Sequence, residues 1–193
     1  RLRKARQDGI DITADQYPYT ASSTSLSATV IPAKYREGSA KDLIKRLDDP
    51  DAGPKMKKAI QDRLDGLLGG KAVKIASYTK NTKWQGKDIA AIAEAEKKSP
   101  LDIVIDITRN GGAAIVNFSM NEEEVRLFMK EPYIATASDG SARIPNSTVP
   151  HPRSYGTFPR KIGRYSLDDE IIPLAQAIRS SSGLPADILR LPE

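Results

Sequence analysis

The 193 residues carry 30 Lys and Arg against 25 Asp and Glu, a net charge of +5, and 39% of them are hydrophobic. This composition can bury a core and predicts a globular chain. One His and no Cys exclude disulfides, thiolate nucleophiles and any metal site that needs several His or Cys ligands from this chain. No apolar run approaches the roughly 18 residues of a bilayer span, and no signal peptide is recognisable, so we expect a cytoplasmic protein without membrane contact. The basic residues are dispersed, which argues against nucleic-acid binding.

The first residues predict the end of a helix followed by a strand. Residues 1–8 have a basic helical pattern, and Gly9 stands where a left-handed residue would end the helix. Residues 10–19 alternate with period two and predict a strand with one polar, aromatic face. Residues 20–28 are rich in small hydroxyl side chains and predict a loop at the carboxyl end of that strand, where α/β folds bind ligands.

Apolar periodicity and capping residues place the remaining elements. The expected helices are a pair within residues 40–68 interrupted at 49–54, residues 88–97, a helix beginning at Pro100, and residues 122–130, 167–180 and 186–191. The expected strands are residues 72–78, 113–119 and 133–139. Residues 140–160 are rich in Pro, Ser and Gly and predict a long ordered loop anchored by Arg153, Tyr155 and Phe158. The alternation of helices and strands predicts an α/β fold.

The clearest chemical signal comes at the end of the strand expected at 133–139. Ser138, Asp139 and Gly140 put a carboxylate at its carboxyl end, beside a Gly that lets the backbone turn. Such a carboxylate can face a pocket as a general acid or base, or it can simply cap a turn. Spacing alone favours the turn.

Four sequence strings occur in order along nearly the whole chain: TADQYPYTASSTSL at 13–26, FSMNEEEVRLFM at 118–129, ASDGSA at 137–142 and HPRSYGTFPRKIGRY at 151–165. Together they resemble the C-terminal half of the N-acyl-D-amino-acid deacylases, or D-aminoacylases, of the amidohydrolase superfamily. The resemblance implies a zinc-dependent (β/α)8 barrel that carries a long insertion near its seventh strand.

On this resemblance the fold is a partial (β/α)8 TIM barrel with a large α/β insertion. Residues 1–34 would form barrel strand seven and a substrate loop, residues 35–120 the insertion covering the active site, and residues 121–193 strand eight, the HPR loop and the last barrel helices. The family's main zinc ligands, a His-x-His pair, a Cys and two later His, cannot be found in this sequence. We therefore expect a fragment, inactive alone, whose partner is the N-terminal barrel half and whose zinc is bound mainly by residues outside this chain.

The resemblance also implies roles for individual residues. Asp139 would be the strand-eight aspartate, a general base toward the metal-bound water and then a general acid toward the departing amine, and at most a ligand of a weak second metal position. Hydroxyls of Tyr19 and Ser25 would bind the α-carboxylate of the substrate, with Tyr17 and Ser23 as alternatives in register. Ordinary strand packing would also explain both tyrosines.

Further residues of the resemblance have two interpretations each. Arg153 would form a bidentate salt bridge with a substrate carboxylate, or it would pin its loop to backbone carbonyls. Phe118 and Met120 would form an apolar wall of the substrate pocket, or belong to the core. His151 is expected to be a structural hydrogen bonder of the loop rather than a ligand. Asn117 stands where the family often has an aromatic residue, which leaves both a hydrophobic and an acidic D-amino acid open.

The predicted function is hydrolysis of the amide bond of N-acyl-D-amino acids, giving a D-amino acid and a carboxylate, in the complete enzyme. One alternative is a catalytically inactive binding or interaction module with the same fold. Salt-dependent binding to nucleic acid would favour this alternative. Another is a cyclic-amide hydrolase resembling hydantoinases and dihydroorotases. The serine loop and the HPR string argue against that last alternative.

Overall fold

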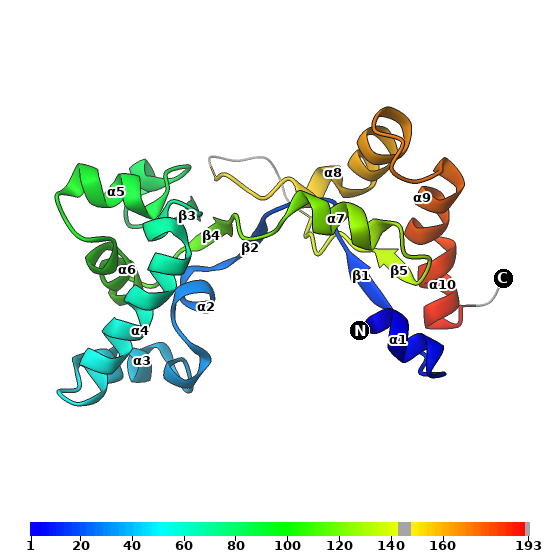
Figure 1. Ribbon diagram of the computed structural model, residues 1–193. Coiled ribbons are helices and arrows are strands. Elements are labelled where there is room, and N and C mark those ends of the chain that lie inside the picture. Colours follow the sequence, from blue (N-terminus) through cyan, green and yellow to red (C-terminus); the bar gives the residue numbers. More distant parts are fainter. Residues whose placement is uncertain (143–147, 192–193) are drawn as a thin grey trace. The chain divides into compact units, whose positions relative to one another are not determined.

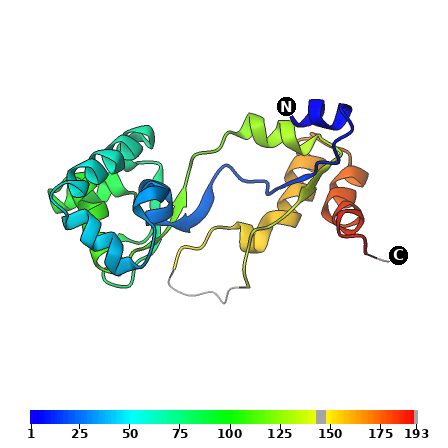
Figure 2. The ribbon, with the colours of Figure 1, turned by 90° about the horizontal axis from the view of Figure 1, so that it is seen from below.

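The computed structural model describes residues 1–142 and 148–191 (Figures 1 and 2). The chain divides into two compact units. Of the described residues, unit 1 comprises 1–20, 120–142 and 152–191, and unit 2 comprises 21–119 and 148–151. Part of the predicted loop, residues 143–147, lies outside the described residues. The expected domain limits at residues 34 and 120 stay a prediction.

Unit 1 contains two short strands that are distant in sequence and pair in parallel. β1 (Ala14–Gln16) and β5 (Ile134–Thr136) run side by side, with Ala14 opposite Ile134 and Gln16 opposite Thr136 (Figure 1). A parallel pair needs a crossover connection, and here the crossover contains all helices and strands of unit 2 and one helix of unit 1. Strands were expected at both places, and both are shorter than the alternating pattern indicates.

Unit 1 also contains helices. They are α1 (Leu2–Gln7), α7 (Glu122–Met129), α8 (Arg153–Arg160), the π-helix η4 (Lys161–Asp168), α9 (Leu174–Ser181) and α10 (Gly183–Leu189). Helix α7 packs against β1, while α9 and α10 pack against β5 (Figure 1). The core of unit 1 is small and consists of Val125, Met129, Tyr165, Ile172 and Ala177.

Unit 2 has its own antiparallel sheet, in the order β2–β4–β3. The strands are β2 (Ser22–Ser25), β3 (Val73–Ser77) and β4 (Ala114–Asn117), and Asn117 of the central strand lies opposite both Ser22 and Val73. The helices are α2 (Leu26–Val30), α3 (Ala40–Asp48), α4 (Ala52–Gly66), α5 (Ile89–Glu96) and α6 (Pro100–Arg109), with 3-10 turns η1 (Ala33–Tyr35), η2 (Leu68–Gly70) and η3 (Thr82–Trp84). Helices α3 and α4 pack together, as do α5 and α6 (Figure 2).

The core of unit 2 is larger and follows from the apolar periodicity of its helices. It contains fully buried side chains from each α-helix of the unit and from strands β3 and β4. Among them are Leu26, Leu47, Met56, Ile60, Leu64, Val73, Ile75, Ile89, Ile92, Ile103, Ile107 and Ile115. The expected helices within 40–68, at 88–97 and from Pro100, and the expected strands at 72–78 and 113–119, are confirmed.

Two predicted loops are wrong. Residues 20–28 contain β2 and the start of α2, because the Ser25 hydroxyl accepts a hydrogen bond from the Ala28 amide (3.2 Å) and caps that helix. The C-terminal part of the loop predicted at 140–160 is the helix α8, which has Pro152 rather than a hydroxyl residue at its N-cap. Contacts with distant residues, described below, stabilise α8 in place of a local cap.

The last expected helix begins late. Of residues 167–180, only those from Leu174 belong to α9, because the preceding turns continue α8 as the π-helix η4. Within the described ranges, no helix is long and apolar enough to cross a membrane.

Candidate active-site residues

Asp139, Arg153 and Tyr17 meet at the carboxyl ends of the parallel strands of unit 1. The Arg153 Nη2 atom lies 2.9 Å from the Asp139 Oδ2 atom, in an ion pair. The Nη1 atom of the same guanidinium group donates a hydrogen bond to the Tyr17 hydroxyl (3.3 Å). Arg153 is only 9% exposed, whereas the side chain of Asp139 is 69% exposed. The guanidinium group therefore holds a solvent-facing carboxylate from the protein side.

The backbone at Asp139 adopts an uncommon conformation. Its φ angle is +45°, in the left-handed region that Asp and Asn adopt more readily than most other residues. The next residue must be small, because a Cβ atom on Gly140 would lie 2.9 Å from the Cα atom of Ser154. The Ser138-Asp139-Gly140 sequence thus allows β5 to end in a tight turn against the start of α8.

Tyr19 packs beneath α8. The Arg160 guanidinium lies 5.0 Å from the centre of the Tyr19 ring, and its Nε atom donates to the Pro18 carbonyl (2.7 Å). The Tyr19 hydroxyl donates to the Pro152 carbonyl (3.4 Å). A Cβ atom on Gly156 would lie 2.6 Å from that hydroxyl oxygen, so only Gly fits there. Burial raises the pKa of Tyr19, and the charge of Arg160 opposes that rise.

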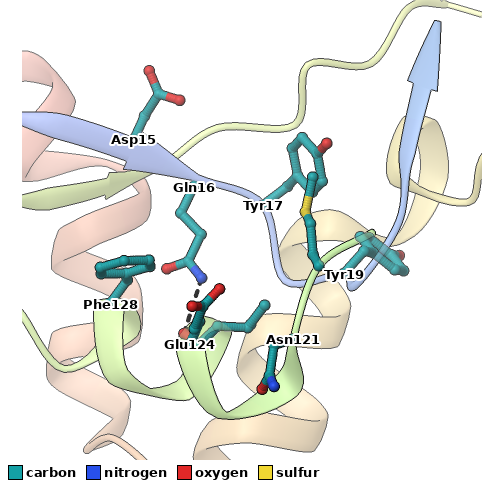
Figure 3. Close-up of a pocket in the computed structure, with 9 residues that line it drawn as sticks. Asp15, Gln16, Tyr17, Tyr19, Asn121, Glu124 and Phe128 are labelled. Atoms are coloured by element: carbon teal, nitrogen blue, oxygen red, sulfur yellow. Dashed lines mark hydrogen bonds between the residues drawn. The ribbon is translucent and has the colours of Figure 1, made fainter. Parts of the chain in front are cut away.

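A cavity of about 240 Å³ opens between the end of β1 and helix α7 (Figure 3). Tyr17, Tyr19 and Met120 line it, and the Met120 amide donates to the Thr20 carbonyl (3.1 Å). The rest of the lining is Asp15, Gln16, Asn121, Glu124, Val125 and Phe128. In Figure 3 the Gln16 amide points to α7, where it donates to the Val125 carbonyl (2.9 Å). The cavity can enclose an apolar group beside two phenol rings.

The other expected site residues belong to unit 2. Ser23 lies in β2 opposite Val116, and Ser25 caps α2. The exposed Phe118 ring lies 5.5 Å from the Lys74 ammonium group. His151 is buried and its Nε2 atom pairs with the Ala21 carbonyl (2.8 Å), as expected for a structural hydrogen bonder. The structure thus brings together Asp139, Tyr17, Tyr19, Met120 and Arg153 within unit 1.

Comparison with known proteins agrees with the resemblance of the motifs. The chain is 28% identical over 190 residues to an N-acyl-D-glutamate deacylase of Alcaligenes xylosoxydans xylosoxydans, covering 98% of the chain and 30% of that relative. It is 29% identical over 182 residues to a D-aminoacylase of the same organism, covering 94% of the chain and 28% of the relative. No protein-family model matches the chain.

Solved structures give the same result. The N-acyl-D-glutamate deacylase of Bordetella bronchiseptica, crystallised with zinc and a phosphonate inhibitor, matches with a TM-score of 0.69 at 25% identity, over 98% of this chain and 31% of that one. A D-aminoacylase studied for its binuclear metal centre matches with a TM-score of 0.65 at 26% identity, over the same shares of the two chains. The chain is similar, over nearly its whole length, to one segment of the N-acyl-D-amino-acid deacylases. Its mixed α/β fold is that of the matching part of these amidohydrolases, and it spans about 30% of their length.

Side chains that could bind a metal do not cluster in the described part of the chain. Within residues 1–142 and 148–191, no three His, Cys, Asp or Glu side chains lie close enough together to hold a metal ion. Asp139 has Arg153 as its charged neighbour. The described side chains therefore do not fit a zinc centre by themselves.

Sequence reasoning missed two residues beside this site. Arg160 lies two turns after Arg153 on α8, on the same face, a spacing that becomes visible only if the HPR string is taken as a helix. Lys161 is 3% exposed, and its ammonium group donates to the Thr136 hydroxyl (2.5 Å) and the Ser180 hydroxyl (2.7 Å). Burial lowers the pKa of Lys161 to about 8. Lys161 lies among other basic residues in the sequence, so no apolar periodicity indicated that it would be buried.

Proposed function

We propose that the chain supplies part of the active site of an N-acyl-D-amino-acid deacylase, which hydrolyses the amide bond of its substrate to release a D-amino acid and a carboxylate. The observation that carries this proposal is the cluster of Asp139, Arg153 and Tyr17 at the carboxyl ends of two parallel strands. Active sites of α/β barrels lie at that end of the strands.

The proposed architecture is a partial (β/α)8 barrel in which β1 and β5 are neighbouring strands seven and eight. Their parallel pairing supports this arrangement, and so does the placement of α7, α9 and α10 against them. Each strand has one outer edge that pairs with no other strand in the described residues. In the proposed enzyme an N-terminal barrel half covers these edges, and the protein is cytoplasmic.

Asp139 is the proposed general base and acid. Its carboxylate is exposed and oriented by Arg153, so it can accept a proton from the water whose oxygen attacks the amide carbon. The same proton then passes to the amide nitrogen as the carbon–nitrogen bond breaks, so the amine leaves neutral, and the acid product loses the second water proton to become the carboxylate. Zinc is bound in a relative, and we propose that its main ligands lie outside this segment, with Asp139 contributing to a weak second position at most.

Substrate binding is assigned to the residues around this carboxylate. Arg153 and the hydroxyls of Tyr19 and Ser25, or of Tyr17 and Ser23, are the proposed partners of the substrate α-carboxylate. The Arg153–Asp139 ion pair supports this assignment, because the guanidinium group already pairs with a carboxylate. Met120 in the apolar cavity supports its assignment to the wall of the substrate pocket, and Phe118 is the proposed second member of that wall.

The decisive variant is Asp139→Asn in a protein that carries this segment together with the remaining two-thirds of the family's length. We expect kcat on N-acetyl-D-amino acids to fall by about 10²–10⁴-fold while substrate affinity stays within a few fold, because Asn keeps an oxygen for Arg153 but loses the proton transfer. Asp51→Asn, an exposed carboxylate of unit 2, serves as the charge-matched control. Unchanged kcat would refute the role of Asp139, and an inactive parent enzyme would favour the binding-module alternative.

Zinc content of the chain itself tests the second part of the proposal. After zinc loading and dialysis, elemental analysis should find much less than one zinc per chain, because the described residues hold no three-ligand cluster. One tightly held zinc per chain would show that the segment builds its own metal centre.

A further inference from the structure

Unit 2 contains a second, more polar cavity of about 520 Å³. It lies between α2, the last turns of α4 and the end of β4. Its lining is Ala28, Thr29, Asp62, Arg63, Gly66, Leu67, Asn117 and Ser119, all of them residues of unit 2. A space of this size is typical of small-molecule sites.

Asn117 is the unusual residue of this cavity. It shares a face of the central strand with Ile115, a core residue, so the alternation of β4 would favour an apolar side chain there. Asn117 is instead 9% exposed. Its Nδ2 atom donates to the Ser119 hydroxyl (2.9 Å), whereas its Oδ1 atom has no hydrogen-bond partner among the described residues. A buried amide oxygen left unpaired costs about 1–3 kcal/mol, which points to a donor supplied from outside the chain.

Two residues of opposite charge line the same cavity as this amide. Arg63 makes no hydrogen bond or ion pair within residues 1–142 and 148–191, so its guanidinium group is available to an anion. The Asp62 carboxylate lies next to it in the lining and shares its charge with Lys58 (2.9 Å). The cavity therefore offers one hydrogen-bond acceptor, one carboxylate and one unpaired cation.

We propose that this cavity binds a free amino acid in its zwitterionic form. The ammonium group donates to the Asn117 Oδ1 atom and is attracted by Asp62, while the carboxylate pairs with the planar guanidinium group of Arg63. A simple carboxylate would leave the Asn117 oxygen unpaired, and a simple amine would leave Arg63 unpaired. Only a ligand with both groups close together satisfies the two sides of the cavity.

This inference is independent of the proposed deacylase activity. It uses residues of unit 2 alone, none of which takes part in the proton transfer assigned to Asp139. Binding of an amino acid here can therefore be measured on the 193-residue chain, whether or not that chain hydrolyses anything.

The test is a titration of the ¹⁵N-labelled chain with glycine and with D-glutamate, followed by NMR. We expect saturable shifts of the Asn117 side-chain amide and of backbone amides near Thr29, Arg63 and Ser119, with dissociation constants of about 1 mM or below. Acetate and methylammonium, each tested alone, should bind at least about tenfold more weakly.

Two variants locate the ligand. Arg63→Gln and Asn117→Leu should each weaken binding by about tenfold or more, while Lys83→Gln, which makes the same charge change far along the chain, should not. Asn117→Leu replaces an unsatisfied buried amide by an apolar side chain, so the variant is expected to fold. No saturable shift with either amino acid at about 10 mM, or wild-type affinity in both variants, would overturn the proposal.

Discussion

The two units differ in what stabilises them. In unit 2, four of the five α-helices begin with a side-chain cap, and the antiparallel sheet lies against a large apolar core. Among the described helices of unit 1, only α7 has a side-chain cap, the two strands are held by parallel pairing between distant segments, and the core is small. Unit 2 is thus determined mainly by local sequence, whereas unit 1 depends on long-range contacts. Asp139, Arg153 and the two tyrosines of the candidate site belong to the unit whose structure depends on those contacts.

The largest expected difference concerns the core. Ile115→Ala in β4 removes a fully buried side chain and should lower the free energy of unfolding of unit 2 by about 2–5 kcal/mol. Ile134→Ala in β5 should have a smaller effect on unit 1, because that strand has neighbours on one edge only. Hydrogen exchange of peptides from each unit, followed by mass spectrometry, measures both. A larger loss of protection with Ile134→Ala would reverse the comparison.

The next effect is a pH dependence that belongs to unit 1. Burial lowers the pKa of Lys161 from 10.5 to about 8, so at neutral pH the folded state holds a buried ammonium group. As the pH rises from about 8 toward 10.5, the folded amine loses its proton first, and stability should increase by up to about 3 kcal/mol. Below pH 8 both states are protonated and this contribution is flat.

Denaturant unfolding between pH 7 and 10.5 measures this increase. In Lys161→Met the increase should disappear, and the variant should be at least as stable at neutral pH, because the Ser180 hydroxyl keeps its bond to the Gln176 carbonyl. Lys130→Met, at an exposed position, is the control in which stability should still increase with pH as in the wild type. If stability increases with pH in Lys161→Met as it does in the wild type, another group causes the pH dependence.

A smaller effect tests the contact between α8 and Tyr19. Gly156→Ala should destabilise unit 1 by about 1–3 kcal/mol, because the new Cβ atom would lie 2.6 Å from the Tyr19 hydroxyl oxygen. Gly163→Ala, in η4, meets no atom within 4 Å and is the matched control. Adding Tyr19→Phe to Gly156→Ala should restore most of the loss, and a double-mutant cycle measures the coupling. Additive effects in that cycle would mean that position 156 does not require Gly because of a clash with the Tyr19 hydroxyl.

These differences explain which elements could be predicted from the sequence. The N-caps of α5, α6 and α7 are Asp88, Ser99 and Asn121, whose side chains accept hydrogen bonds from the first turn, and all three helices were predicted. Helix α8 has no such cap and contains both Gly156 and Pro159, so local signals favoured a loop. Its helical form depends on Tyr19 and Pro18, which lie far away in sequence.

The same reasoning applies to the candidate site. Asp139 at the end of its strand was predictable, because strand, carboxylate and Gly are contiguous in the sequence. The contact of Arg153 with Asp139 and Tyr17 was not, since it requires α8 to start at Arg153 and β1 to pair with β5. The burial of Lys161 among hydroxyls follows from the packing of η4 on α9, which no short motif encodes.

The smallest effect separates locally capped helices from uncapped ones. Ser99→Ala removes the hydroxyl that caps α6, and should destabilise unit 2 by about 1 kcal/mol. It should also raise the pKa of Asp102 toward its ordinary value, because the hydrogen bond from the Ser99 hydroxyl is the main cause of its lowering. Ser182→Ala, before α10, should change stability less, since that hydroxyl bonds the Ile178 carbonyl and caps nothing. Thermal unfolding of both variants measures the difference. Equal losses would show that the serine hydroxyl stabilises these helices through something other than the cap, and the contrast between the two units would then rest on their cores alone.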